Sequence, residues 1–145
     1  MIHDSYKFLA SHNRRGYIFQ SEGMAGKVIK VVTFQLLEEN YYNLALGDFR
    51  KGKADYISTT NNKDFVKVLS TVAKIVYAFW DEHPQATIVI TPLDEKRSRL
   101  FHAIFRRHYE TVQQKCTIFG IIGEDLREKF VVDKEYLGFE LKLID

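Results

Sequence analysis

The hydrophobic pattern of this 145-residue chain changes its period at Asn61. Before that residue, apolar and polar side chains alternate, as they do from Tyr42 to Leu46. After it, apolar side chains recur every three or four positions from Phe65 to Trp80. Alternation is typical of half-buried strands, and the longer spacing indicates an amphipathic helix. The chain therefore predicts a sheet with helices packed against it.

The alternating half of the chain predicts three strands and a weaker fourth, at residues 17–22, 27–37, 41–49 and 55–58. Short connections at Gly23–Gly26 and Glu38–Asn40 separate the first three. Connections of this length favour antiparallel pairing between neighbours. The first half is therefore expected to form an antiparallel meander.

The helical pattern predicts a helix over residues 64–82 that ends before Pro84. Asn61 or Asn62 is expected to cap its first free amides, and Asp64 suits the positive end of its dipole. The apolar stripe of this helix is wide, which indicates that neighbours cover it on more than one side.

The second half then predicts a short buried strand and another helix. The β-branched run Ala86–Ile90 lies between the two prolines and is typical of a strand buried on both faces. The next helix is expected over residues 95–112, with Thr91 or Asp94 as its cap. The tail predicts a strand at residues 117–122, a charged connection at 123–129 and a final strand at 138–144.

These elements predict one α/β (α+β) domain over residues 1–145: a single-layer mixed, mostly antiparallel sheet with two main helices, in the order β-β-β-(β)-α-β-α-β-β. A chain with 46% hydrophobic residues, 28% charged residues and a net charge of +2 agrees with one soluble domain. The lone Cys116 closes no intramolecular disulfide. Without a leader-like or bilayer-length apolar segment, we expect an unprocessed cytoplasmic protein that does not contact a membrane.

This element order resembles the GNAT acyltransferase fold over roughly residues 17–122. The resemblance implies a glycine-rich turn before the long helix that holds coenzyme A, and a tyrosine acid in the last core helix. The corresponding turn at residues 59–64 contains no glycine, and Leu100–Ala103 has Phe101 where that family has tyrosine. Phenylalanine donates no proton, and Asp64 would repel a pyrophosphate. We therefore expect no cofactor, with acetyl-CoA as the alternative.

In its residues the chain is similar to an uncharacterised family of small bacterial proteins of the kind found in Bacteroidetes. Five stretches carry this similarity: Tyr17–Gly23, Gly26–Lys30, Tyr42–Asp48, Asn61–Asp64 with Lys67–Ala73, and Arg97–Phe101. That family has no assigned activity. The resemblance therefore implies a shared fold and surface and supplies no reaction.

Basic residues gather where the predicted buried strand leads into the second helix. From Leu93 to Lys115 there are six basic and three acidic residues, a local charge of +3 against +2 for the chain. Free amides at a helix start and arginine side chains both bind anions. The ligands predicted for this anion site are Lys96, Arg97, Arg99 and Asn62. The alternative is an ordinary solvated helix face, in which Asp94 or Glu95 pairs with Arg99.

A second polar set lies on the third predicted strand. Asp48 shares a strand face with two leucines, so its carboxylate is expected to point inward, and Asn43 lies nearby in sequence. A buried carboxylate needs a partner, for which Arg97 or Arg99 is the candidate. The alternative is that Asp48 is a catalytic base with a shifted pKa.

The function expected first is a non-catalytic module that binds an anionic ligand or a protein partner near Arg97 and Arg99. The alternatives are a diverged GNAT-like acyltransferase, and an RNA-binding or toxin–antitoxin component that uses dispersed basic residues with tyrosines. Histidines and the single cysteine show no ligand spacing, so no metal is predicted. A homo-oligomer through an open sheet edge stays an option.

Overall fold

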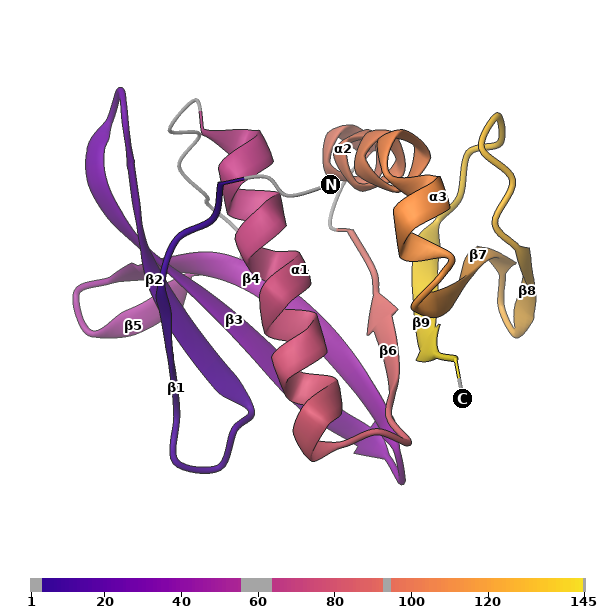
Figure 1. Cartoon of the computed structure of the whole chain (residues 1–145), viewed down its shortest axis with the longest axis horizontal. Coiled ribbons are helices and arrows are strands. Elements are labelled where there is room, and N and C mark those ends of the chain that lie inside the picture. The colour runs from indigo at the N-terminus through magenta and orange to yellow at the C-terminus, as the bar shows by residue number, and fades with distance from the viewer. Residues whose placement is uncertain (1–3, 56–63, 93–94, 145) are drawn as a thin grey trace. The chain divides into compact units, whose positions relative to one another are not determined.

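A computed structural model describes residues 4–55, 64–92 and 95–144, except for the side chains at positions 54, 55, 96, 100 and 104 (Figure 1). The chain divides into two compact units. The first unit comprises Met1–Gln35 with Ala45–Pro84, and the second comprises Leu36–Leu44 with Gln85–Asp145. Two long strands, β3 and β4, contribute residues to both units.

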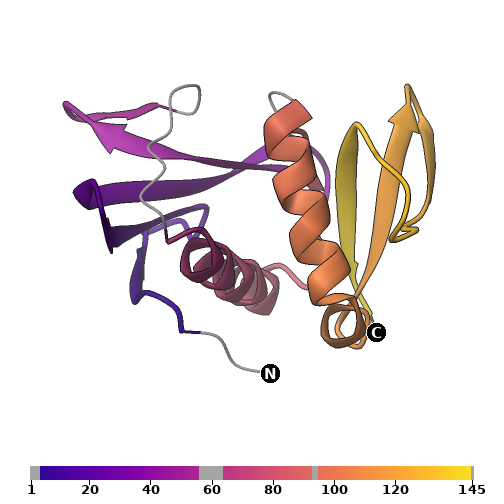
Figure 2. The ribbon, with the colours of Figure 1, turned by 90° about the horizontal axis from the view of Figure 1, so that it is seen from above.

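The first unit is an antiparallel meander with one helix, α1, along a face of strands β2 and β3 (Figure 2). It contains β1 (Phe8–Ala10), β2 (Gly16–Gly23), β5 (Lys53–Asp55) and α1 (Phe65–Glu82). It also contains β3 (Gly26–Glu38) as far as Gln35 and β4 (Tyr41–Arg50) from Ala45 onward. The hairpin of β2 and β3 closes with Gly23 paired to Gly26, whose φ of 88° suits glycine. The predicted antiparallel meander is thereby confirmed.

The core of the first unit is aromatic. In register, Tyr17 of β2 is paired with Val32 of β3, and both are buried. The ring of Phe34 stacks on Phe79 of α1 at a centroid distance of 4.0 Å and meets Tyr17 edge-on at 5.8 Å. Most of the predicted apolar stripe of α1 is buried: Val68, Leu69, Val72, Val76, Phe79 and Trp80. Ala73 at the same spacing is exposed, whereas Thr71 and Ile75 beside the stripe are also buried. Burial of this stripe against the sheet stabilises the helix more than its intrinsic propensity does.

The second unit places the start of β4 beside β6, which pairs with β9, followed by β7 and β8. Its elements are β6 (Thr87–Ile90), α2 (Glu95–Arg107), α3 (Tyr109–Val112), β7 (Cys116–Gly123), β8 (Leu126–Lys129) and β9 (Gly138–Leu143). Strand β6 runs parallel to β4 and antiparallel to β9. As predicted, β6 is buried, because it lies between two strands and carries apolar side chains on both faces.

Aromatic rings also fill the core of the second unit. Phe105 of α2 lies 4.9 Å from Phe139 of β9 and 6.0 Å from Phe130, measured between ring centroids. Phe139 is completely buried. Figure 2 shows α2 beside the strands β9 and β7. This packing fixes which face of α2 is turned away from the core.

The mixed, mostly antiparallel sheet predicted from the sequence is confirmed, whereas the GNAT-like order is not. Strand β1 precedes the first strand predicted from the sequence, and α3 is separate from α2 because the helix is interrupted at His108. Strand β8 is the main correction, since residues 123–129 were expected to be a connection. In the described residues, β8 pairs with β7 alone, and a charged edge strand lacks the alternation that marks a strand. Only the first residue of the weak strand 55–58 lies within the described part.

Cys116 begins β7 and is 2% exposed. Burial raises the pKa of its thiol from 9.0 to about 12, because a thiolate would lose its hydration there. Neither α1 nor any other helix in the described residues has the length and hydropathy that a membrane span requires.

Candidate functional site

A groove of about 960 Å³ lies in the second unit, between α2 and the loop at residues 132–137 that leads into β9. The helix contributes Glu95, Arg99, His102 and Arg106 to it. These residues are four, three and four positions apart, which places them on one helix face. Packing of Phe105 into the core turns this polar face toward the groove.

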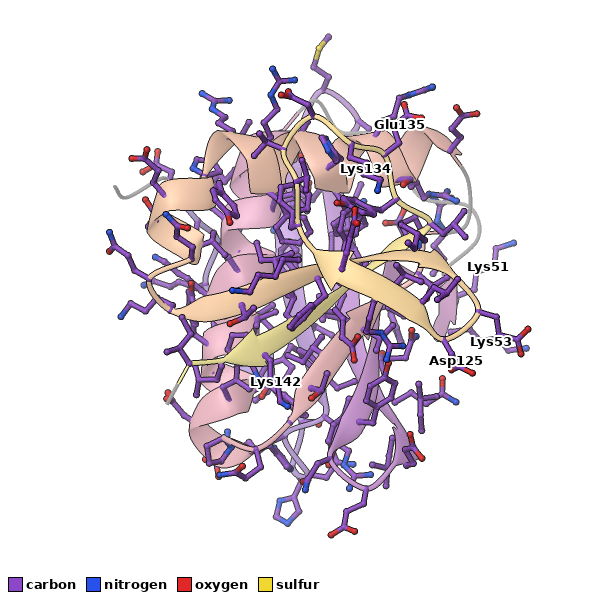
Figure 3. All side chains as sticks on the ribbon, turned by 90° about the vertical axis from the view of Figure 1, so that its right-hand side faces the viewer. Lys51, Lys53, Asp125, Lys134, Glu135 and Lys142 are labelled. Atoms are coloured by element: carbon purple, nitrogen blue, oxygen red, sulfur yellow. The ribbon has the colours of Figure 1, made fainter. Side chains whose placement is uncertain are left out.

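The opposite wall is a loop that hydrogen bonds hold in place. The Tyr136 hydroxyl donates to Glu128 Oε1 at 2.8 Å and accepts from the Val131 amide at 3.0 Å. Ser98 Oγ of α2 donates to the Tyr136 carbonyl at 2.8 Å, which ties the loop to the helix. Lys134 forms an ion pair with Glu128 at 2.7 Å. Figure 3 shows Lys134 and Glu135 on this loop, which passes in front of α2 in that view.

This network changes the pKa of each of its titratable members. Hydrogen bonds from Lys134 and Tyr136 lower the pKa of Glu128. Burial, and then the hydrogen bond to Glu128, raise the pKa of Tyr136. The ring of Tyr136 lies over Gly120 of β7, where an added Cβ would come within 2.2 Å of the ring. Tyr136 is thus seated by β7, β8 and α2 together.

The charged side chains that α2 contributes to the groove fall into two groups. Arg99 pairs with Glu95 at 3.4 Å, but both side chains are mostly exposed, so the pair is weak. Within the described part of the chain, Arg106 and Arg107 take part in no ion pair, although both line the groove. Two arginines at the end of α2 are therefore available to a ligand.

His102 occupies the middle of the helical wall. Its Nε2 atom is buried and has no hydrogen-bond partner. Its ring lies 5.2 Å from Phe130, measured between centroids. Buried polar nitrogens in folded proteins nearly always have a partner. A ligand group or a water molecule in the groove could form the hydrogen bond that Nε2 lacks.

The four anion ligands predicted from the sequence do not share one position in the structure. Arg99 lines the groove, and Arg97, although half-buried, is not among the lining residues. The side chain of Lys96 and all of Asn62 lie outside the described residues. Convergence of the four residues stays a prediction. The basic residues that sequence reasoning did not choose as ligands, Arg106 and Arg107, complete the helical wall.

Asp48 is buried in the first unit, as its strand face predicted. Its side chain is 0% exposed and contacts Lys30 Nζ at 2.6 Å through Oδ1 and Arg50 Nη2 at 2.9 Å through Oδ2. These partners come from β3 and β4, whereas we expected Arg97 or Arg99. Full burial gives a substrate no access to the carboxylate, so this arrangement favours a structural role over a catalytic base. Asn43 is half-buried, lies opposite Val89 of β6 and belongs to the second unit, whereas Asp48 belongs to the first.

Another polar cluster holds the N-terminal segment against α1. Asp64 Oδ2 accepts hydrogen bonds from the Tyr6 hydroxyl at 2.6 Å and from Ser21 Oγ at 2.5 Å. The Tyr6 amide donates to Thr71 Oγ1 at 2.8 Å, and Lys67 Nζ lies 4.3 Å from the ring centroid of Tyr6. The Asp64 carboxylate therefore accepts hydrogen bonds from two hydroxyl groups. It makes no side-chain capping hydrogen bond to α1. Burial, and then Asp64, raise the pKa of Tyr6.

Among the residues that the structure describes, no three histidine, cysteine, aspartate or glutamate side chains lie close enough to hold a metal ion. Neither the curated proteins nor the solved structures include a match to the chain. A family model matches residues 2–144, and its description is a family of unknown function (DUF6934). The chain therefore belongs to this family of unknown function, as the resemblance stated from its residues had indicated.

Proposed function

We propose that the protein is a non-catalytic module that binds an anionic small molecule in the α2 groove. The observation that carries this proposal is that Arg106 and Arg107 line the groove without an ion-pair partner among the described residues. The planar guanidinium group binds phosphate and carboxylate oxygens through two parallel hydrogen bonds. The ligand is accordingly a molecule with at least one phosphate or carboxylate group.

Three further features support an anion at this wall. Arg99 has only an exposed pair with Glu95, which is worth about 0–1 kcal/mol and is easily given up. His102 offers a buried nitrogen without a partner. The groove volume of about 960 Å³ lies at the upper end of the usual small-molecule range of about 300–1,000 Å³.

The test is calorimetric titration of the protein with phosphate, pyrophosphate, citrate and nucleotides. We compare the double variant Arg106→Gln with Arg107→Gln against the matched double variant Lys115→Gln with Lys142→Gln. The control removes two exposed positive charges from the same unit outside the groove. A hydrogen bond to a charged group contributes about 1.5–3 kcal/mol, so the groove variant should bind at least about tenfold more weakly.

The control variant should bind within about twofold of the parent protein, because screening leaves distant surface charges little effect. Equal losses in both double variants would show that binding is a general charge effect and would overturn the proposed site. Absence of binding by every anion in the series would overturn the proposed function.

Two arms of the same experiment address the alternatives drawn from the sequence. Acetyl-CoA tests the acyltransferase, and its binding supports that alternative only if the double variant at positions 106 and 107 retains it. A short RNA tests nucleic-acid binding, for which affinity must fall steeply with added salt. Binding that the groove variant removes is assigned to the anion site.

A further inference from the structure

The wall that faces α2 carries unpaired charge of the opposite sign. Asp133 and Glu135 both line the groove and are exposed. In the residues described, neither forms an ion pair, so their carboxylates lie more than 4.0 Å from every described cation. The groove therefore presents two separate charged ends rather than a uniformly basic lining.

Pairing accounts for the other charged groups at this site. The cation of Arg99 faces Glu95 of its own helix, and the cation of Lys134 is bound to Glu128 of β8. The groups that remain are two guanidinium groups on α2 and two carboxylates on the loop. Because they do not reach one another, a molecule between them would have to complement both.

We infer that the ligand of this groove is a zwitterion, with its acid group at Arg106 and Arg107 and a protonated amine at Asp133 and Glu135. This inference rests on the proposed function and specifies the substrate class of the same groove. A ligand with two acid groups gains the contacts to the arginines but brings its second charge toward two carboxylates. A diamine gains the contacts to the carboxylates but brings its second ammonium group toward the two arginines. Discrimination of this kind comes from repulsion as much as from attraction.

The loop is held firmly enough to select among zwitterions by length. Tyr136 is hydrogen-bonded to Glu128 and Val131, and its carbonyl is bound by Ser98 of α2. These contacts lie on both sides of Asp133 and Glu135 in the chain. Because the two walls are joined through Ser98, the distance between the charged ends is limited, and one chain length should fit best.

The test uses molecules of equal length that differ only in their terminal charges. Glutarate, 5-aminopentanoate and cadaverine form such a set, and the corresponding sets with four to eight carbon atoms vary the span. Affinities are measured by calorimetry at low salt for the parent protein, for Asp133→Asn with Glu135→Gln, and for Arg106→Gln with Arg107→Gln. The double variant Lys115→Gln with Lys142→Gln is again the control.

At the best length, we expect the zwitterion to bind at least fivefold more tightly than the diacid. The variant at positions 133 and 135 should lose this preference and bind the diacid at least as well as the parent protein does. The variant at positions 106 and 107 should bind both acids more weakly. Melting temperatures within 2 °C of the parent show that the exposed substitutions leave the fold intact.

The outcomes separate this inference from the function on which it rests. The zwitterion inference fails if the diacid binds the parent protein as tightly as the zwitterion does. It also fails if the variant at positions 133 and 135 keeps the preference for the zwitterion. Either result leaves the anion site in place. A diamine that binds most tightly also overturns it. If no acid in any set binds, both the inference and the proposed function fail.

Discussion

The two units of this protein use charged residues in opposite ways. In the first unit, Lys30 and Asp48 are buried and form an ion pair, and Arg50 forms a second ion pair with the same carboxylate. In the second unit, Arg106 and Glu135 line a groove, and neither has an ion-pair partner among the described residues. Both sets combine carboxylate with cationic side chains, but Lys30 and Asp48 are buried and in contact, whereas Arg106 and Glu135 are exposed.

The difference shows that burial, rather than charge, separates structural groups from candidate ligands. A charge removed from water must be compensated inside the fold, so its partner is fixed by stability. A charge at the surface of a groove has no such requirement, because water solvates it. Substitutions that treat the two sets alike should therefore have unlike effects.

The largest loss of stability is expected from Asp48→Asn in the first unit. This change leaves Lys30 buried without its ionised partner, which should lower the free energy of unfolding by about 3–5 kcal/mol. Urea unfolding at pH 7 measures the change. Asp133→Asn in the groove is the matched control and should stay within about 0.5 kcal/mol. A loss below 1 kcal/mol for Asp48→Asn would remove the contrast between the units.

The next largest effect is expected from Gly120→Ala under the ring of Tyr136. The new Cβ would lie 2.2 Å from ring atoms, so the ring must move and the fold should lose about 1–3 kcal/mol. Because Tyr136 also supports the groove, ligand binding should weaken in the same variant. Gly26→Ala, at the start of β3, would strain the backbone at a positive φ and lies outside the residues that line the groove. Unchanged ligand binding in Gly120→Ala would show that the loop does not need the packing of the Tyr136 ring on Gly120.

Tyr6→Phe should destabilise the first unit by about 1–2 kcal/mol. It removes the hydroxyl that donates to Asp64 at 2.6 Å and leaves the stacking on Phe19 in place. The effect should vanish at high pH. The folded state raises the pKa of Tyr6 above 10.0, so its contribution is present below pH 10 and is lost as the pH rises through the folded value. Chemical unfolding at pH 7 and at pH 10.5 or above measures both parts, and a constant difference would contradict the assignment.

A smaller, pH-dependent effect is expected from Glu128→Gln in the second unit. The folded state lowers the pKa of Glu128 below 4.5, so the stability that it contributes is present above pH 4.5 and is lost as the pH falls through the folded value. The parent protein should therefore melt at a higher temperature than the variant at pH 7, and the gap should close in acid. Melting curves between pH 7 and pH 3 measure this gap. A gap that widens in acid would contradict the direction of the pKa change.

The smallest effect on stability is expected from Arg106→Gln with Arg107→Gln. Exposed side chains without an ion pair contribute little, so the free energy of unfolding should change by less than about 0.5 kcal/mol. This variant should lose ligand affinity at nearly constant stability. A loss above 2 kcal/mol in urea unfolding would instead place these arginines with the structural charges of the first unit.

Hydrophobic periodicity predicted most of the fold. It located α1 to within one residue at its start, and it identified β6 as a buried strand because Ala86–Ile90 is apolar on both faces. It failed for β8, whose Leu126–Lys129 sequence carries charge on an exposed edge. Periodicity reports burial, so a strand with little burial gives little signal.

The candidate site was less predictable than the fold. Local charge indicated α2, which forms one wall of the groove, but it did not indicate Arg106 and Arg107 as lining residues. The spacing of Glu95, Arg99, His102 and Arg106 was the available signal, because they share one face of α2. Nothing in the sequence indicated Asp133 or Glu135, which reach the groove through the pairing of β7, β8 and β9. The inward orientation of Asp48 was predictable from alternation, whereas its partner Lys30 depended on the register of β3.

The burial of Cys116 makes the chain its own reporter of unfolding. A thiol that is 2% exposed, with a pKa near 12, reacts with an alkylating reagent only when β7 opens. Its labelling rate therefore measures the opening of the second unit under native conditions, without an added probe. A new cysteine in place of the exposed Ala103 at the groove would react at once by comparison. One chain would then carry a fast label at the ligand site and a slow one in the core, so ligand occupancy and unfolding could be followed separately in one sample.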